Sequence, residues 1–284
     1  MREVFDAIGV RGFVHAVDLD SGAETGHDPD EGVVLASVFK IPVVLEYARQ
    51  AAAGELERTE RLTVTDADKD GGIGTSGCAD DVSLTLRDLA HFMMTMSDNA
   101  ATDVLLRRVG LDRVNGTLAE LGLKRTRLIG GCAELFQSVA DDLGLPTLDD
   151  ENLPGITPEQ ILGLSVRDPE RTTAGTSREI TTLLGQIWKD QAGPPEACAE
   201  VRTIMGKQVW PHRLGSAFTD EVKISAKTGT LWGVRNEAGV LEYPDGRRYA
   251  VAVFLHGDDL GFRNSAADSA IGKAARLAVD ELRA

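Results

Sequence analysis

Residues 222–257, VKISAKTGTLWGVRNEAGVLEYPDGRRYAVAVFLHG, decide the fold. They contain three strand-like runs, VKISAKTGTLWG, RNEAGVLEY and RRYAVAVFLHG, and turn residues 244–246 separate the last two. Near the other end of the chain, residues 12–26 (GFVHAVDLDSGAETG) alternate apolar and polar side chains and then turn at 20–22. This pattern predicts a strand and a hairpin. Strands at both chain ends favour one antiparallel sheet that is completed by the two ends.

The middle of the chain is mostly helical by its apolar period, and a further helix follows the last strand. Between the helical runs, residues 140–159 are acidic, rich in Pro and Gly, and without a period. We expect a long surface loop there, which in a compact domain is functional or mobile. The predicted helices cover residues 37–54, 83–96, 99–110, 111–122 and 265–283.

Composition excludes some classes of partner. The chain has 284 residues and a formal net charge of −15, which argues against a nucleic-acid backbone or an anionic membrane as the partner. The three cysteines, Cys78, Cys132 and Cys198, are an odd number at wide spacing, which fits a reducing compartment. Because the first residues also lack a secretory pattern, we expect a cytoplasmic protein, or a secreted one whose leader is absent from this sequence. We expect a monomer.

An apolar run, LASVFKIPVV (35–44), carries a lysine whose burial needs an explanation. Ser37 precedes Lys40 by three residues, so on a helix the two side chains emerge on one face. A serine hydroxyl becomes a nucleophile when a neighbouring base takes its proton, and a desolvated lysine can be that base. Roughly one such pair is expected by chance in a chain of this composition, so the pair alone carries little weight.

Two further triplets follow. SDN at 97–99 lies between two predicted helices, where each residue type also suits a helix N-cap. KTG at 227–229 lies in a strand-like run, where a lysine and a glycine are also ordinary at a strand edge or end. Each triplet alone has an ordinary structural explanation. The ordered set of three is far rarer than its members.

In this order, Ser-x-x-Lys, Ser-Asp-Asn and Lys-Thr-Gly resemble the signature of class A β-lactamases and penicillin-binding proteins. Ser97 lies 60 residues after Ser37, an interval similar to that of the class A enzymes. The surrounding runs VHAVDLDSGAETGHDPDEGVVLASVFKIPVV, LTLRDLAHFMMTMSDNAATDVLL and AKTGTLWGVRNEAGV also resemble that family. The resemblance covers roughly residues 12–129 and 172–283.

The resemblance implies an α+β sandwich, in which a five-stranded antiparallel sheet is flanked by helices and carries an inserted all-helical domain. We therefore expect one β-lactamase-like unit over residues 1–284. Its sheet subdomain would comprise residues 1–34 and 215–284, and its helical subdomain residues 35–214, with a long acidic loop at 130–171.

The resemblance also implies the catalytic roles. Ser37 would attack a carbonyl carbon and Lys40 would be its base, although the acylation base of the family is disputed. The backbone N–H groups of Ser37 and Thr230 would form the oxyanion hole. Ser97, linked to Lys227, would pass the proton to the leaving nitrogen.

Further residues would bind the substrate by the same resemblance. Thr228, with Lys227 and the adjacent Gly229, would hold a substrate carboxylate, and Asn99 would hold the acyl-side amide. Arg213, fourteen residues before Lys227, either assists with the carboxylate or ends a surface helix. The implied substrate is a small molecule, a β-lactam or a related amide or ester with a carboxylate.

The pattern breaks where class A enzymes place the glutamate that activates the deacylating water. Carried over from the run TRL (126–128), this position falls on Cys132, which we interpret as a small buried residue rather than a second nucleophile. Glu134 is our tentative base. A missing base slows deacylation, since general bases typically contribute 10²–10⁴-fold. The other candidate bases are Asp149, Asp150 and Glu151.

The sequence thus predicts a serine hydrolase acting through a Ser37 acyl-enzyme, with weak deacylation. Two alternatives stay open: a D,D-peptidase- or esterase-like acyl transferase, and a β-lactam-binding protein that stays acylated. We expect no cofactor and no metal, because the five histidines are scattered without paired-ligand spacing.

Overall fold

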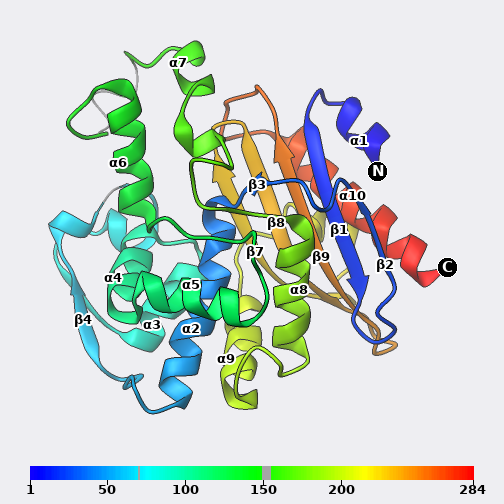
Figure 1. Cartoon of the computed structure of the whole chain (residues 1–284), viewed down its shortest axis with the longest axis horizontal. Helices are drawn as coiled ribbons and strands as arrows, with labels where there is room; N and C mark the ends of the chain where they lie inside the picture. Colours follow the sequence, from blue (N-terminus) through cyan, green and yellow to red (C-terminus); the bar gives the residue numbers. More distant parts are fainter. Residues whose placement is uncertain (70, 149–154) are drawn as a thin grey trace.

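A five-stranded antiparallel sheet lies at the centre of the computed structural model, which describes residues 1–69, 71–148 and 155–284 (Figure 1). Its order is β2-β1-β9-β8-β7, so the first long strand of the chain pairs with the last. The predicted sheet from both chain ends, with its N-terminal hairpin, is confirmed. The strands are β1 (Arg11–Asp18), β2 (Glu24–His27), β7 (Lys223–Leu231), β8 (Val234–Glu242) and β9 (Arg248–His256).

Strand β9 shows why helices cover both faces of the sheet. Phe254 points into the larger hydrophobic core, which includes the apolar side of α8 (Ser177–Trp188). Val253 points to the opposite face and packs in a second core with α10 (Ser265–Arg283). Because neighbouring residues of a strand point to opposite faces, an almost wholly apolar strand needs a cover on each side. In Figure 1, α8 lies in front of the sheet and α10 behind it.

Seven further helices lie between the first and last strands in sequence and gather beside the sheet, as predicted (Figure 1). They are α2 (Lys40–Ala52), α3 (Leu86–Thr95), α4 (Asn99–Val109), α5 (Leu111–Glu120), α6 (Cys132–Leu143), α7 (Pro158–Leu162) and α9 (Pro195–Met205) within the described residues. A short helix, α1 (Arg2–Asp6), precedes β1. Short 3₁₀ segments span Ala36–Phe39, Asp66–Asp68, Gly74–Gly77, Ser165–Arg167 and Leu214–Ala217, and short strand pairs join β3 (Val33–Val34) to β6 (Ala174–Gly175) and β4 (Arg61–Val64) to β5 (Val82–Thr85).

Two predicted helix starts are wrong by three residues. The helix predicted from residue 83 begins at Leu86, because residues 82–85 pair as strand β5 with β4. Thr85 then caps the helix, its side chain accepting a hydrogen bond from the Asp88 amide. The helix predicted from residue 37 begins with the 3₁₀ segment Ala36–Phe39, and its α-helical part begins at Lys40.

The acidic stretch 140–159 is not a loop at either end. Helix α6 continues to Leu143 and ends at Gly144, whose φ of 69° is a left-handed conformation that favours glycine. Helix α7 begins at Pro158 with a capping box from Thr157. The candidate bases Asp149, Asp150 and Glu151 lie outside the described residues.

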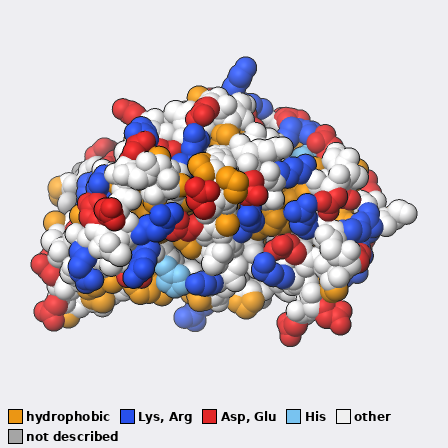
Figure 2. Space-filling model, turned by 90° about the horizontal axis from the view of Figure 1, so that it is seen from below, with side chains coloured by type: hydrophobic (Ala, Val, Ile, Leu, Met, Phe, Trp, Pro, Cys, Tyr) orange, Lys and Arg blue, Asp and Glu red, His pale blue; other side chains and the backbone are white. Residues whose placement is uncertain are grey.

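The surface mixes both signs of charge. On the face drawn in Figure 2, Lys and Arg side chains are interspersed with Asp and Glu side chains. The net charge of −15 is therefore not gathered into one acidic field on this face. Within the described residues, no helix is both long and apolar enough to cross a bilayer.

Candidate active site

Edge strand β7 passes very close to the segment that leads into α2. A Cβ added at Gly229 would lie 2.7 Å from the Leu35 carbonyl oxygen and 3.3 Å from the Ser37 amide nitrogen, so only glycine fits there without a shift. From β8, Asn236 donates its side-chain amide to the carbonyl oxygens of Val34 (2.9 Å) and Leu35 (3.2 Å). The half-buried Ser37 is thereby held against the sheet edge that carries the KTG motif.

Two non-glycine residues at this site have left-handed backbone conformations. Ala36, directly before Ser37, has a φ of 46°, and Ser97 has a φ of 66°. Such conformations cost about 1–3 kcal/mol each and persist where the surrounding structure enforces them, often at functional sites. One of these residues directly precedes Ser37 and the other is Ser97, the two serines that the resemblance assigned to catalysis.

The burial of Lys40 in an apolar run is explained by the polar partners of its ammonium group. It donates to the Ser97 carbonyl oxygen at 2.8 Å, to Ser97 Oγ at 3.2 Å and to Asn99 Oδ1 at 3.0 Å. Burial lowers the pKa of Lys40, while the negative charges of Cys132 and Asp103 oppose this shift. The first two motifs of the sequence thus meet at one nitrogen atom.

Lys227 is also fully buried. Its Nζ donates to the Thr228 carbonyl oxygen at 3.0 Å. Burial, followed by the positive charges of Lys40 and Arg213, holds the pKa of Lys227 well below its ordinary value. Because Gly229 of the same motif lies close to the Ser37 amide, the KTG motif lies at the segment that carries the Ser-x-x-Lys pair.

The SDN motif also serves as a helix cap. The Asp98 carboxylate accepts from the Ala101 amide at 3.0 Å, which caps α4, and from the Thr75 amide at 2.6 Å, which ties down the glycine-rich run. Gly72, with a φ of 103°, lies so close that a Cβ there would be 3.2 Å from Asn99 Nδ2. The glycine-rich run therefore lies against Asn99, at the edge of the site where the resemblance implied it.

Arg213 is buried, unlike the surface helix-end residue that was one of its two interpretations. Its guanidinium group donates to the Gly229 carbonyl oxygen at 2.9 Å and to Thr230 Oγ1 at 2.6 Å, and it pairs with Asp268 at 2.9 Å. It also donates to the Asn236 carbonyl oxygen at 2.7 Å. These contacts hold the end of β7 in place.

The Cys132 thiol lies inside the site. Its Sγ is 3.3 Å from Asn99 Oδ1, the same atom that accepts from Lys40, and it interacts with Lys40 directly. The carboxylate of Asp103 accepts from the Cys132 amide at 2.7 Å and from the Ala133 amide at 2.8 Å. Burial raises the pKa of Asp103 to about 6 despite these two hydrogen bonds.

Glu134, the tentative base, is exposed. Its carboxylate accepts from the Gly131 amide at 2.7 Å as part of a capping box on α6. It lines a pocket of about 180 Å³ together with Asp103 and Gly130, and the lining of this pocket does not include Ser37 or Lys40. The structure thus gives Glu134 a capping role and does not bring it to Ser37.

Several residues that support the site were missed from the sequence. Glu237 is buried and its pKa is raised by burial; it accepts from Gln208 Nε2 at 2.6 Å, and Gln208 Oε1 accepts from the Thr228 amide at 2.9 Å. With Asn236, this chain of contacts positions β7. The available signal was the polar pair Asn-Glu inside an otherwise apolar strand run.

Within the described residues, no group of three or more His, Cys, Asp or Glu side chains could hold a metal ion.

The geometry can be compared with known proteins. The family model described as the Beta-lactamase enzyme family matches residues 1–282. This chain belongs to the β-lactamase enzyme family. The family named by the resemblance is confirmed, and with it the predicted fold class. Membership supports a serine β-lactamase-like hydrolase that acts on a small molecule.

Individual relatives of this β-lactamase-family chain are distant. It is 28% identical over 307 residues to the "Beta-lactamase regulatory protein BlaB" of Streptomyces cacaoi, covering 100% of this chain and 97% of the relative. It is 27% identical over 248 residues to a "Beta-lactamase" of Streptomyces cellulosae, covering 86% and 71%. The crystal structure of a β-lactamase from Sphaerobacter thermophilus superposes with a TM-score of 0.79 at 28% identity, covering 98% of this chain and 94% of that chain.

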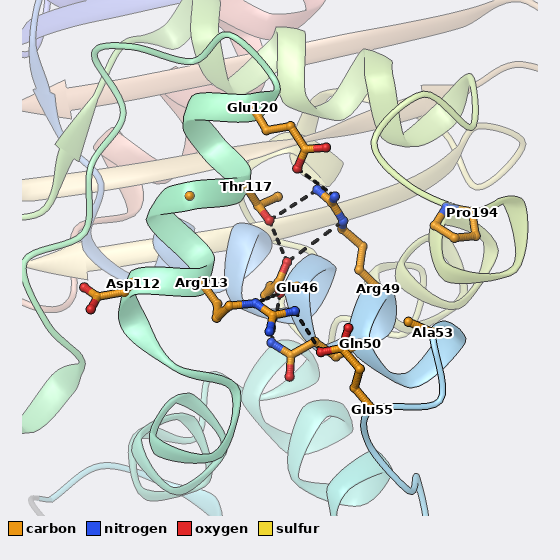
Figure 3. Close-up of a pocket in the computed structure, with 11 residues that line it drawn as sticks. Glu46, Arg49, Gln50, Ala53, Glu55, Asp112, Arg113, Thr117, Glu120 and Pro194 are labelled. Carbon is orange, nitrogen blue, oxygen red and sulfur yellow. Dashed lines mark hydrogen bonds and ion pairs between the residues drawn. The ribbon is translucent and has the colours of Figure 1, made fainter.

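Further along α2, the β-lactamase-family chain has a charged pocket of about 410 Å³ (Figure 3). The buried Glu46 lies at its centre. Its carboxylate accepts from Thr117 Oγ1 at 2.6 Å and from Gln50 Nε2 at 2.8 Å, and it pairs with Arg113 at 3.3 Å and Arg49 at 3.9 Å. Glu46 thus has polar partners on both α2 and α5, so we interpret these contacts as a network that anchors α2 to α5.

Replacing Glu46 with alanine is therefore expected to lower the free energy of unfolding. We expect a loss of about 2–3 kcal/mol, below the range for wholly buried pairs, because both guanidinium groups reach solvent. Urea unfolding measures the change. Glu55→Ala is the matched control: it removes a half-exposed partner of Arg113 and should cost less than about 1 kcal/mol. Equal losses in the two variants would contradict the central role of Glu46.

Proposed function

We propose that this chain is a serine β-lactamase-type enzyme that opens a β-lactam amide through an acyl-enzyme on Ser37 and releases the product slowly. The observation that carries this proposal is the buried Lys40, three residues after Ser37, which donates hydrogen bonds to both Ser97 and Asn99. A buried lysine with a lowered pKa is neutral often enough to accept a proton from a serine hydroxyl.

Acylation would use the three motifs together. Lys40 takes the proton of Ser37 as Ser37 Oγ attacks the lactam carbonyl carbon. The Ser37 and Thr230 amides stabilise the oxyanion, and the close approach of Gly229 to the Ser37 amide supports this pairing. Ser97, which accepts from Lys40 at 3.2 Å, relays the proton to the leaving nitrogen.

Substrate binding would involve the end of β7. Lys227 and Thr228, with Gly229 as the close backbone contact, would hold the carboxylate, and Asn99 would hold the acyl-side amide. The guanidinium group of Arg213 already donates to four protein groups, one of which is Thr230 Oγ1. Arg213 would therefore act by positioning Thr230 rather than by binding the substrate.

Deacylation would be slow because a thiol stands near Lys40 and Asn99, where a carboxylate base would face the acyl-enzyme. Without a positioned carboxylate, much of the 10²–10⁴-fold contribution typical of a general base is absent. The exposed Glu134 bonds to its own helix, which supports Cys132 as the residue that determines this rate.

Intact-protein mass spectrometry over time, after mixing with a penicillin and separately with a reactive cephalosporin, tests the proposal. We expect one adduct per chain that maps to Ser37 and then decays, with several turnovers in excess substrate. An adduct that never decays would contradict turnover and favour a binding protein. The absence of any adduct would contradict the β-lactam substrate.

A further inference from the structure

Cys132 contacts two residues of the proposed acylation machinery, Lys40 and Asn99, but has no role itself in acylation as described above. Cys132 Sγ and Lys40 Nζ both contact Asn99 Oδ1, at 3.3 Å and 3.0 Å, and the thiol also interacts with Lys40 itself. Cys132 is only 5% exposed and Lys40 is fully buried. Such a buried thiol–lysine contact is unusual for a cysteine that only fills space.

The surroundings of Cys132 favour a thiolate. It is the first residue of α6, a helix of 12 residues, so its side chain lies where the helix dipole is positive. Lys40 adds a positive charge beside it. A helix N-terminus and a neighbouring lysine are the two features that make a cysteine acidic and reactive. These two features favour a proton shared between the Cys132 thiol and Lys40.

Other titratable groups face Cys132 and Lys40 and enter their titration. From α4 and its cap, Asp103 and Asp98 contribute negative charge, and from β7, Lys227 contributes positive charge. Burial, and to a smaller degree the negative charge of Glu134 on the thiol's own helix, raises the pKa of Asp103 to about 6. Asp103 therefore titrates in a lower pH range than an ordinary thiol.

The buried carboxylates around the site already accept hydrogen bonds from backbone amides. Asp98 accepts from two amides and Asp103 from two more, while Glu237 accepts from an amide and from Gln208. Each would lose a cap or a strand contact by turning toward Ser37.

We propose that Cys132 is the general base of deacylation, its thiolate activating the water that hydrolyses the Ser37 acyl-enzyme. The proposal rests on the proposed function, since it needs that acyl-enzyme. In this proposal, the Cys132 thiolate accounts for the slow deacylation that still occurs although no carboxylate base is positioned at the site.

The protons of this step balance through Lys40. The Cys132 thiolate takes one proton from water as the water oxygen bonds to the acyl carbonyl carbon. Collapse of the tetrahedral intermediate breaks the bond to Ser37 Oγ, and the Lys40 ammonium returns a proton to that oxygen. The product leaves as a carboxylic acid, and Cys132 and Lys40 again hold one proton between them.

The test is the rate at which the Ser37 adduct decays, measured by mass spectrometry across pH in the full chain and in Cys132→Ser. In the wild type, the rate should rise with pH to a plateau as the thiol loses its proton. In Cys132→Ser it should be about 10²-fold slower and lack this rise, because a serine hydroxyl does not ionise in this range. In Cys132→Glu, the rise should shift to lower pH.

Cys198→Ala is the matched control, since Cys198 is buried in α9, belongs to none of the motifs, has its thiol at the Gly193 carbonyl oxygen and should leave the profile unchanged. The ultraviolet absorbance of the thiolate, wild type minus Cys132→Ala, should titrate in step with the decay rate. An unchanged pH profile of adduct decay in Cys132→Ser would overturn this proposal, and so would a thiol that stays protonated across the plateau. In both cases, the adduct on Ser37 would still support the proposed function. If neither the wild type nor any variant forms an adduct, both this proposal and the proposed function are overturned.

Discussion

Replacing Ser37 with alanine is expected to abolish covalent labelling by penicillins and cephalosporins and to reduce hydrolysis by at least about a thousandfold. The hydroxyl is the only part of this side chain that can bond to an acyl group. Because Ser37 is half-buried at the start of a 3₁₀ segment and alanine is a good helix former, the fold should persist. Mass spectrometry and a chromogenic cephalosporin measure the two losses.

Ser21→Ala, in the exposed β1–β2 turn, is the matched control and should label at the wild-type rate. An adduct that still forms in Ser37→Ala and maps to Cys132 would show that the thiol is the nucleophile. Hydrolysis at the wild-type rate without any adduct would contradict covalent catalysis altogether.

Replacing Lys40 with methionine is expected to slow acylation by about 10²–10⁴-fold, the usual contribution of a general base. Methionine keeps the apolar stem but leaves Ser97 and Asn99 without their shared donor. The wild-type rate should also depend on pH. Only neutral lysine can take the Ser37 proton, so the rate should rise with pH, and the lowered pKa of Lys40 should place this rise below the ordinary lysine value.

Lys40→Arg separates the charge of this residue from its basicity. An arginine keeps the positive charge but does not give up its proton in proteins, so its acylation should be slow and independent of pH. Lys189→Met, at the exposed end of α8, controls for a lysine substitution elsewhere. Thermal unfolding shows whether each variant is folded. A folded Lys40→Arg that acylates at the wild-type rate would contradict the role of Lys40 as a base.

The sequence predicted the sheet and the three motifs because these depend on local patterns. Alternation marked β1, a strand-like apolar run marked β9, and the turn at 244–246 marked the hairpin between β8 and β9. The last helix has the predicted bounds. The motif spacing identified Lys40 and Ser97, whose hydrogen bond joins residues 57 apart in the chain.

What the sequence could not predict depends on contacts between distant segments. The strand Val82–Thr85 exists because it pairs with β4, which overrides the helical pattern around it. The position of Arg213 under the end of β7 needs Asp268 from α10, and nothing local to Arg213 indicates that partner. The contact of Cys132 with Lys40 likewise depends on how α6 enters beside Asp103.

The pairing of β1 with β9 has a consequence for how the molecule is made. Phe13 pairs with Phe254, so the centre of the sheet cannot form until nearly the whole chain has been synthesised. Contacts between such distant segments form slowly, because a long loop must close before they contribute to stability. On a ribosome, helix α2, which begins at Lys40, and the connection between α3 and α4 that carries Ser97 would emerge long before the strand that carries Lys227. Ser37 would meet the KTG motif only in the last stage of folding, so a chain interrupted before β7 is complete would lack the candidate active site.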